Sequence, residues 1–345
     1  MSALISIIIP AYNAATWIGS TIDSAVMQDW QRKEIIIVDD GSTDETLKVA
    51  RAKECKFIKV ITQENRGAAV ARNSGLAVAQ GDYIQWLDAD DVLAPDKLST
   101  QLRRVEAGDG ANVLLSSAFG TFISRPQRSK FSPHALWQDL APIDFLLMKF
   151  TNNLWMSPGV WLVSRSLTER AGPWDERLSL DDDGEYFARV VSKSEGIRFV
   201  PEARVYYRQA HVGSLSRRIS DRACISLLLS LRLCIDHLLS LEKSERTRDA
   251  SLQLLQNWID RGTYFYPDRA ELVCELNQLA RDLGGSVRSA RLDWKYRPVR
   301  ALFGWNAVRR AKALVADVKL RSRILAETCR TKVLRNRDHS VVEAC

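Results

Sequence analysis

The 345-residue chain has few cysteines, and no two of the six form a C-x-x-C pair. They are scattered and lie mostly among apolar residues, where a free thiol packs as a small hydrophobic side chain. The sequence therefore predicts neither a disulfide framework nor a zinc site, which fits a protein of the cytoplasm.

The chain also lacks an uninterrupted apolar run of about 20 residues, the length that spans a bilayer as a helix. Its most leucine-rich segment, residues 224–241, contains Arg232, Asp236 and His237. The apolar N-terminus has no basic lead and runs into a turn sequence at residues 10–13, unlike a signal peptide. We therefore expect no membrane-spanning helix, no secretion signal and a cytoplasmic location.

Internal repeats, low-complexity tracts and a G-x-G-x-x-G motif after the first predicted strand are absent as well. The last absence argues against an oxidoreductase. What remains is an ordinary globular composition, with 46% hydrophobic and 26% charged residues. Such a chain forms one large domain or two modest ones.

The net charge of +7 is unevenly distributed. Residues 281–345 hold 16 Lys and Arg against 6 Asp and Glu, a net +10, whereas the rest holds 33 against 36, a net −3. A mildly acidic front and a basic tail indicate catalysis in one part and attachment to an anionic surface in the other. We expect a catalytic region over residues 1–216 and a helical region over 217–345 with a basic amphipathic tail.

Up to about residue 120, strand and helix patterns alternate at short intervals, as in a doubly wound, mostly parallel α/β sheet. The expected strands are residues 6–9, 34–38, 57–61 and 83–87, followed later by 197–200 and 204–208. Polar clusters follow the first, second and fourth strands. Because ligands of open parallel sheets bind outside the carboxyl ends of the strands, these clusters mark the expected site.

The strongest chemical signal is Asp88-Ala89-Asp90-Asp91 after the fourth strand. Three carboxylates in four residues repel each other unless a cation is near. Hard oxygen ligands suit magnesium or manganese, which bind through one or two carboxylates plus substrate phosphates. The alternative is an acidic turn that caps the next helix, which starts near residue 95. The neighbouring motifs favour the metal site.

Two weaker motifs accompany it. Asp39-Asp40-Gly41 follows the second strand, where a carboxylate can accept a hydrogen bond from a nucleotide. We prefer this interpretation for Asp40 and an ordinary turn and cap for residues 42–44. Residues 66–75 place a glycine and two arginines at a helix N-terminus, which favours phosphate oxygens. Close helix–sheet packing is the alternative there.

In this order, the motifs resemble glycosyltransferase family 2, the inverting enzymes of the GT-A fold, over roughly residues 4 to 216. The resemblance implies that the base of a nucleotide-sugar is held by Tyr12 and Asp40, with Pro10 and Asn13 shaping the turn. Arg66 and Arg72 are implied near the base or the diphosphate.

The D-x-D element of that family corresponds to Asp88-Ala89-Asp90, extended by Asp91. The resemblance implies that Asp88 and Asp90 take part in donor binding. Of Asp90 and Asp91, one is implied as a ligand of Mn2+ or Mg2+ at the donor phosphates and the other as a contact of the ribose. His211, on a late loop, is implied near the metal or diphosphate, with a solvated histidine as the alternative.

The family also has a Glu-Asp pair that follows a Gly-x-x-Asp-Glu segment and lies seven residues before an arginine. Residues 172–176 match that segment, and counting back from Arg189 places Asp182-Asp183 at the pair. Asp183 is thereby implied as the catalytic base, although the adjoining Asp181 leaves the register open by one. The alternative is a solvated acidic helix start, stabilised by the helix dipole.

Two further surfaces are expected, one for the acceptor sugar and one in the basic tail. One of Trp155, Trp161 and Trp174 is expected to form a platform for an acceptor sugar, and the others to pack in the core. In the tail, one helical stripe is apolar and basic residues flank it. The stripe consists of Val308, Ala311, Val315 and Val318. This is typical of an interfacial helix on anionic lipid, and packing on the catalytic domain fits equally well.

The resemblance and the motifs together predict a metal-dependent inverting glycosyltransferase that uses a UDP-linked sugar and a saccharide or glycolipid acceptor. We expect it to be peripheral to the inner face of the plasma membrane, with no nucleic-acid partner, because no reader motif accompanies the basic tail. One rival is a sugar-nucleotide nucleotidyltransferase, which would need a basic glycine-rich loop at residues 10–13. The other is an inactive membrane-associated scaffold, which the complete set of acidic motifs disfavours.

Overall fold

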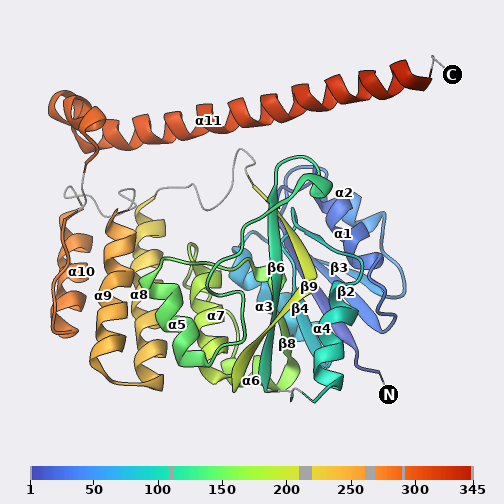
Figure 1. Ribbon diagram of the computed structural model, residues 1–345, viewed down its shortest axis with the longest axis horizontal. Coiled ribbons are helices and arrows are strands. Elements are labelled where there is room, and N and C mark those ends of the chain that lie inside the picture. The colour runs from blue at the N-terminus through green and yellow to red at the C-terminus, as the bar shows by residue number, and fades with distance from the viewer. Residues whose placement is uncertain are drawn as a thin grey trace.

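The computed structural model describes residues 2–108, 110, 112–209, 220–260, 269–289 and 292–342. Four parallel strands form the N-terminal half of its sheet. They are β1 (Ile5–Ala11), β2 (Lys33–Asp40), β3 (Ile58–Gln63) and β4 (Tyr83–Trp86). Within the described residues the strands form one nine-stranded sheet in the order β3-β2-β1-β4-β8-β6-β9-β5, with β7 beside β6. The expected doubly wound α/β architecture is confirmed (Figure 1).

Helices cover both faces of these strands, which explains why β1 and β2 are runs of buried isoleucine. The covering helices are α1 (Ile18–Val26), α2 (Thr46–Arg51) and α3 (Ala68–Val78), whereas α4 (Lys97–Glu106) packs on the second half of the sheet. α3 packs closely because Gly75 faces β1, where a Cβ atom would come within 2.5 Å of Ile8 Cγ2. Gly75 therefore has the packing role that was the alternative for this segment.

The second half of the sheet consists of strands whose bounds were not predicted from the sequence. They are β5 (Val92–Leu93), β6 (Val113–Phe122), β7 (Lys130–Phe131), β8 (Leu162–Ser164) and β9 (Gly196–Arg208). β9 runs parallel to β6, with a register shift opposite Ser117 and Ala118. The two strands expected at 197–200 and 204–208 are thus one strand with an irregularity. β8 lies antiparallel to β4 and joins the two halves.

Further helices pack at the side of this half (Figure 1). They are α5 (Pro142–Thr151), α6 (Arg165–Ala171), α7 (Asp182–Lys193), α8 (Asp221–Leu241), α9 (Glu245–Asp260) and α10 (Ala270–Asp282). One hydrophobic core extends from Ile5 in β1 to Leu283 after α10. Packing is therefore continuous across residue 216, and the division into two regions there stays a prediction.

Among the described residues, α8 is long and apolar enough to cross a membrane by length and composition. Half of its apolar window is buried in the protein, and its leucines join the common core. One such helix is weak evidence for a membrane span, because core helices of globular proteins have the same composition.

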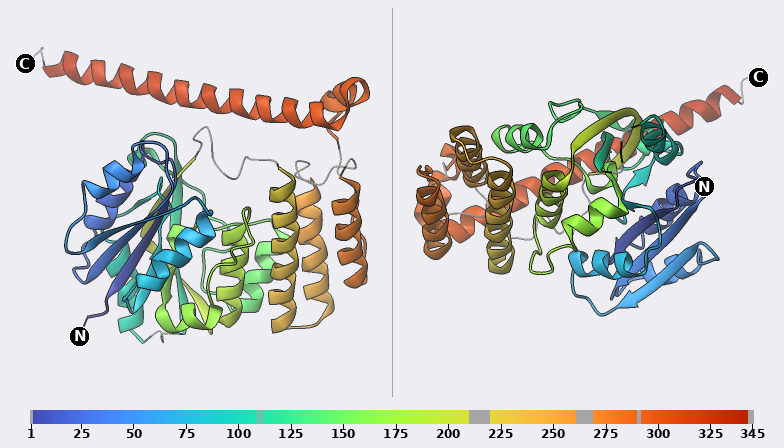
Figure 2. Two further views of the ribbon diagram at one scale, coloured as in Figure 1. Left: turned by 180° about the vertical axis from the view of Figure 1, so that it is seen from behind. Right: turned by 90° about the horizontal axis from the view of Figure 1, so that it is seen from below.

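The basic tail forms α11 (Arg297–Val342), which follows a short 3-10 turn, η4 (Trp294–Tyr296). The helix is kinked at Gly304, where φ is +73°. Figures 1 and 2 show it lying across one side of the molecule, along the side where β9 ends and α8 begins. At its start, Val308 is buried against Tyr296 in a small apolar cluster of its own.

Candidate active site

The loops after β1 and β2 are tied together at the carboxyl edge of the sheet. Asn13 adopts a left-handed conformation, φ +49°, and its side-chain oxygen accepts a hydrogen bond from the backbone N–H of Thr43 at 2.8 Å. Its own N–H donates to Ser42 Oγ at 3.0 Å. Pro10 is half-buried, and Tyr12 is exposed beside this turn. The geometry agrees with a turn-shaping Asn13, and donor binding by Tyr12 stays a prediction.

Asp40, which was expected to bind the donor, is hydrogen-bonded within the protein, and its donor-binding role stays a prediction. Its side chain is buried. Oδ1 accepts hydrogen bonds from Gln63 Nε2 at 2.7 Å and from the N–H of Arg66 at 2.9 Å. Oδ2 accepts from the N–H of Gly67 at 2.8 Å. The carboxylate thus ties the two residues that precede α3 to the end of β2.

The neighbouring Asp39 uses only one of its two carboxylate oxygens in a hydrogen bond among the described residues. Asp39 is buried at the end of β2, and its Oδ2 accepts a hydrogen bond from the N–H of Ser42 at 3.3 Å. Among the residues that the structure describes, its buried Oδ1 has no hydrogen-bond partner, which is costly for a charged acceptor. Ala11, the register partner of Asp39 on β1, directly precedes Tyr12. Oδ1 of Asp39 is therefore a buried acceptor at this edge of the sheet that has no donor among the described residues.

Asp91, in the D-x-D-D segment, is fully buried between distant parts of the chain. Its Oδ1 accepts from the N–H of Arg208 at 2.8 Å and its Oδ2 from Ser157 Oγ at 3.3 Å. Burial and the charges of Asp90 and Asp88 raise the pKa of Asp91 well above its usual range. Its oxygens thus join β9 to the segment before β8, and the metal role of Asp91 stays a prediction. Asp90 is only half-buried.

Arg208, at the end of β9, is a site residue that the sequence patterns missed. It lies between the rings of Trp17 and Phe122, 4.2 and 4.4 Å from their centroids. Its Nε donates to the backbone oxygen of Asp90 at 2.8 Å. Burial lowers the pKa of this guanidinium, against the opposing effect of the nearby aspartates. Arg208 thereby fixes the backbone of the acidic segment.

Arg72 links the donor motif to the candidate base. It is buried on α3, and its Nη2 donates to Asp88 Oδ1 at 2.9 Å while its Nη1 donates to Asp182 Oδ2 at 2.6 Å. Burial alone would lower the pKa of Arg72, but Asp182 and Asp88 raise it above its ordinary value. Arg72 thus positions two carboxylates, and its place near the donor stays a prediction. Arg66 is exposed, 3.7 Å from Glu176.

Helix α7 begins with the acidic pair, directly after a strained residue. Asp181 has a left-handed backbone, φ +59°. A side chain at position 184 would collide with its carboxylate, 2.3 Å from Oδ1. Burial and the charges of Asp182 and Asp181 raise the pKa of Asp183 to about 7. A carboxylate with this pKa is suited to accept a proton near neutral pH.

A polar stripe on α8 holds this segment in place. Ser226 Oγ accepts from the N–H groups of Ser179 and Leu180 at 2.8 and 3.0 Å. Ser230 Oγ donates to Asp181 Oδ2 at 2.7 Å and to its backbone oxygen at 3.1 Å. Residues four apart lie on the same face of a helix. The stripe therefore supports the backbone conformation that starts α7 at Asp182.

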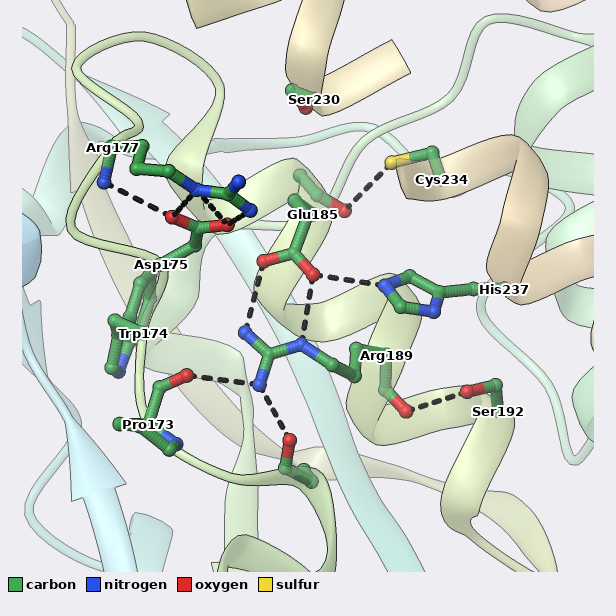
Figure 3. Close-up of polar contacts among 12 residues, drawn as sticks. Pro173, Trp174, Asp175, Arg177, Glu185, Arg189, Ser192, Ser230, Cys234 and His237 are labelled. Atoms are coloured by element: carbon green, nitrogen blue, oxygen red, sulfur yellow. Dashed lines mark hydrogen bonds and ion pairs between the residues drawn. The ribbon is translucent and has the colours of Figure 1, made fainter. Parts of the chain in front are cut away.

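The same face of α8 continues to a buried ion-pair network (Figure 3). His237 Nε2 lies 2.9 Å from Glu185 Oε1. Arg189 binds both oxygens of Glu185, at 2.8 and 3.0 Å. Burial would raise the pKa of Glu185, but the hydrogen bonds from His237 and Arg189 lower it below its usual value. His237 thus ties the first turn of α7 to α8, and Arg189 ties it to the backbone oxygens of Ala171 and Pro173.

The three tryptophans fall into two groups. Trp161 and Trp174 are about 1% exposed and pack in the core, as expected for two of the three rings, whereas the acceptor platform stays a prediction. Trp174 stacks on Tyr186 with centroids 4.0 Å apart and lies 4.2 Å beneath the Arg72 guanidinium. Trp155 is 41% exposed and packs against Tyr207. His211 lies outside the described residues.

Sequence comparison relates the chain to sugar-transferring enzymes. Residues 6–172 match the family described as Glycosyl transferase family 2. An uncharacterised glycosyltransferase of Haemophilus influenzae is 46% identical over 102 residues, 29% of this chain and 41% of that protein. The Escherichia coli UDP-Glc:alpha-D-GlcNAc-diphosphoundecaprenol beta-1,3-glucosyltransferase WfaP is 42% identical over 104 residues, 30% of this chain and 41% of that protein. The chain thus matches less than half the length of either relative.

Structural comparison shows the same fold at low identity. The crystal structure of S. aureus TarS 1-349 in complex with UDP-GlcNAc has a TM-score of 0.61. The likeness covers 73% of this chain and 72% of that one, with 19% sequence identity. It confirms the expected GT-A type of α/β fold. The family match contains Asp39, Arg72, Asp88 and Asp90, while Asp183 and α8 lie beyond it. Residues 6–172, just under half of the chain, thus form a domain of glycosyltransferase family 2.

Proposed function

We propose that this protein transfers one sugar from a UDP-linked donor to a hydroxyl of a saccharide or glycolipid acceptor, inverting the anomeric carbon, with Mn2+ or Mg2+ bound. The observation that carries the proposal is the Arg72 bridge, which brings Asp88 of the donor motif and Asp182 of α7 to one guanidinium. Asp183, with a pKa of about 7, adjoins that bridge. TarS has been seen with UDP-GlcNAc, and a relative is named as a UDP-Glc enzyme.

In this mechanism, Asp183 accepts the proton of the acceptor hydroxyl as the hydroxyl oxygen bonds to the anomeric carbon. The bond between that carbon and the UDP oxygen breaks, and its electron pair leaves with UDP. Because attack and departure occur on opposite faces, the product has the inverted configuration. Trp155 is the exposed ring at the site and supplies the acceptor platform. Family membership argues against the nucleotidyltransferase alternative.

The acidic segment fits a divalent ion only together with the donor. Among the described residues, no group of three or more His, Cys, Asp or Glu side chains is arranged to hold a metal. Asp88 is bound by Arg72, and Asp91 is committed to Arg208 and Ser157. Asp90 belongs to the D-x-D element and is half-buried, and we propose it as the ligand of the ion, together with donor phosphates, as is usual for Mg2+. When bound, the ion neutralises the charge on the departing diphosphate.

UDP should consequently bind far more tightly when manganese is present than when it is chelated. Isothermal calorimetry with UDP, in manganese and then in excess EDTA, measures the difference. A screen of nucleotide-sugars for manganese-dependent hydrolysis then identifies the donor. Equal UDP affinity in both conditions would contradict the metal role, and a failure of all nucleotides to bind would contradict the proposed function.

In the proposed complex, Oδ1 of Asp39 accepts a hydrogen bond from N3–H of the uracil base. Asp39→Asn should therefore weaken UDP binding by roughly 10- to 100-fold, the usual loss when a hydrogen bond to a charged group is removed. The N–H of Ser42 keeps the amide oxygen, so the amide nitrogen takes the place of the unpartnered Oδ1. Uracil presents a donor at N3, whereas cytosine presents an acceptor. The variant should therefore gain CDP affinity relative to UDP, measured by calorimetry.

Glu45→Gln is the matched control for Asp39→Asn, because it removes one negative charge from an exposed residue of the same loop. It should leave the preference for UDP over CDP unchanged. If Asp39→Asn also leaves this preference unchanged, Asp39 does not contact the base.

A further inference from the structure

The tail concentrates exposed apolar side chains. Eleven large apolar residues are exposed among the described ones, and six of them lie between residues 294 and 318. They are Trp294, Leu302, Phe303, Leu314, Val315 and Val318. Elsewhere, side chains of this kind are mostly buried in the common core. Exposed large apolar side chains gathered in one segment mark a candidate interaction site.

The exposed face of α11 points away from the side on which the helix is buried. Leu320 is buried, while Val318 is 54% exposed. Successive helical residues are rotated by about 100°, so residues two apart point in nearly opposite directions. Leu314 and Val315 lie within about 60° of Val318 by the same geometry and are exposed as well. The apolar stripe formed by Leu314, Val315 and Val318 is thus turned outward.

Basic residues line both edges of this stripe. By helical rotation, Arg310 and Arg321 lie along one edge, and Lys312 and Lys319 lie along the other. Over its whole length α11 carries twelve Lys and Arg against three Asp and Glu. A second copy of the same surface would bring like charges together, which is unfavourable. An anionic phospholipid surface accepts the apolar stripe and pairs with both basic edges.

The placement of α11 relates this surface to the active site. Figures 1 and 2 show α11 across the side of the molecule on which β9 ends, and the acidic motifs lie at the same carboxyl edge of the sheet. We propose that α11 docks the enzyme on an anionic phospholipid membrane, with the catalytic edge turned toward the bilayer. The proposal rests on the proposed function for one point only, that the acceptor is a glycolipid at that membrane.

The test uses the full-length protein and vesicles of phosphatidylcholine, with or without phosphatidylglycerol. We expect co-sedimentation with the anionic vesicles and release at high salt. Lys312→Gln/Lys319→Gln should weaken partitioning by roughly 25-fold, because each basic residue near the surface contributes about fivefold. Leu314→Glu should abolish partitioning. Lys48→Gln and Ile225→Glu change exposed residues elsewhere and should have no effect.

Three outcomes would overturn the proposal. The first is equal binding to neutral and anionic vesicles, and the second is equal loss in the control variants. The third is a dimer in sedimentation velocity that Leu314→Glu dissociates, which would assign the face to a second copy. UDP calorimetry on each variant separates this proposal from the proposed function. If a tail variant loses lipid binding but keeps UDP binding, the substitution affects the membrane surface and not the donor site. If the protein binds lipid but no nucleotide, the result contradicts the proposed function and not the membrane proposal.

Discussion

Asp183→Asn should reduce sugar transfer by roughly two to four orders of magnitude, the usual contribution of a general base. The amide keeps the shape of the side chain but accepts no proton. UDP binding should persist, because the donor motif is untouched. The measurement is kcat/KM for transfer in the variant and the wild type, with UDP affinity by calorimetry as the check on folding.

The pH profile of the wild type provides the corresponding signature. A base works only when it is deprotonated, and the pKa of Asp183 is raised to about 7. Activity should therefore be low in acid, rise through pH 7 and level off above it. Asp183→Asn should remove this inflection from its residual activity.

Asp182→Asn tests the electrostatic origin of the raised pKa. The charge of Asp182 is one of the causes that raise the pKa of Asp183, so its removal should move the inflection to lower pH. Glu169→Gln, an exposed carboxylate on α6, should leave the inflection in place. If Asp182→Asn instead abolishes transfer while Asp183→Asn retains it, the base is Asp182 and the register is off by one.

The motifs found in the sequence are those that follow strands directly. Asp88 was predicted as a site residue because it lies in an acidic segment directly after a strand, whereas Asp183 was implied by the family resemblance, through its spacing from Arg189. The choice between Asp39 and Asp40 depends on partners that sequence spacing does not give. Successive residues of a strand point to opposite faces, and only the position of the loop after β3 determines which carboxylate it binds.

The support of the site was missed because it comes from distant segments. Arg208 reaches Asp91 from 117 positions away. Ser226 and Ser230 belong to a leucine-rich helix that resembles a membrane span by composition. A usable signal existed in that helix, since Ser226, Ser230, Cys234 and His237 recur at helical spacing among the leucines. Such a polar stripe indicates a helix that faces polar groups of its own protein.

Arg72→Met should lower the free energy of unfolding by about 3–5 kcal/mol, the typical cost of removing one partner of a buried ion pair. The change leaves the carboxylates of Asp88 and Asp182 without their shared cation. It also removes the guanidinium that lies 4.2 Å over Trp174. Chemical denaturation measures the loss, which should exceed the effect of any exposed arginine.

Arg66→Met is the matched control, because Arg66 is 62% exposed and its carboxylate partner Glu176 is 3.7 Å away. Exposed pairs contribute only about 0–1 kcal/mol, so stability should hardly change. The double variant Arg72→Met/Asp182→Asn removes a charge that Arg72→Met leaves unpaired. It should therefore be more stable than the sum of the two single changes predicts. Strict additivity would mean that Arg72 and Asp182 do not interact, and the bridge between the donor motif and α7 would lose its physical basis.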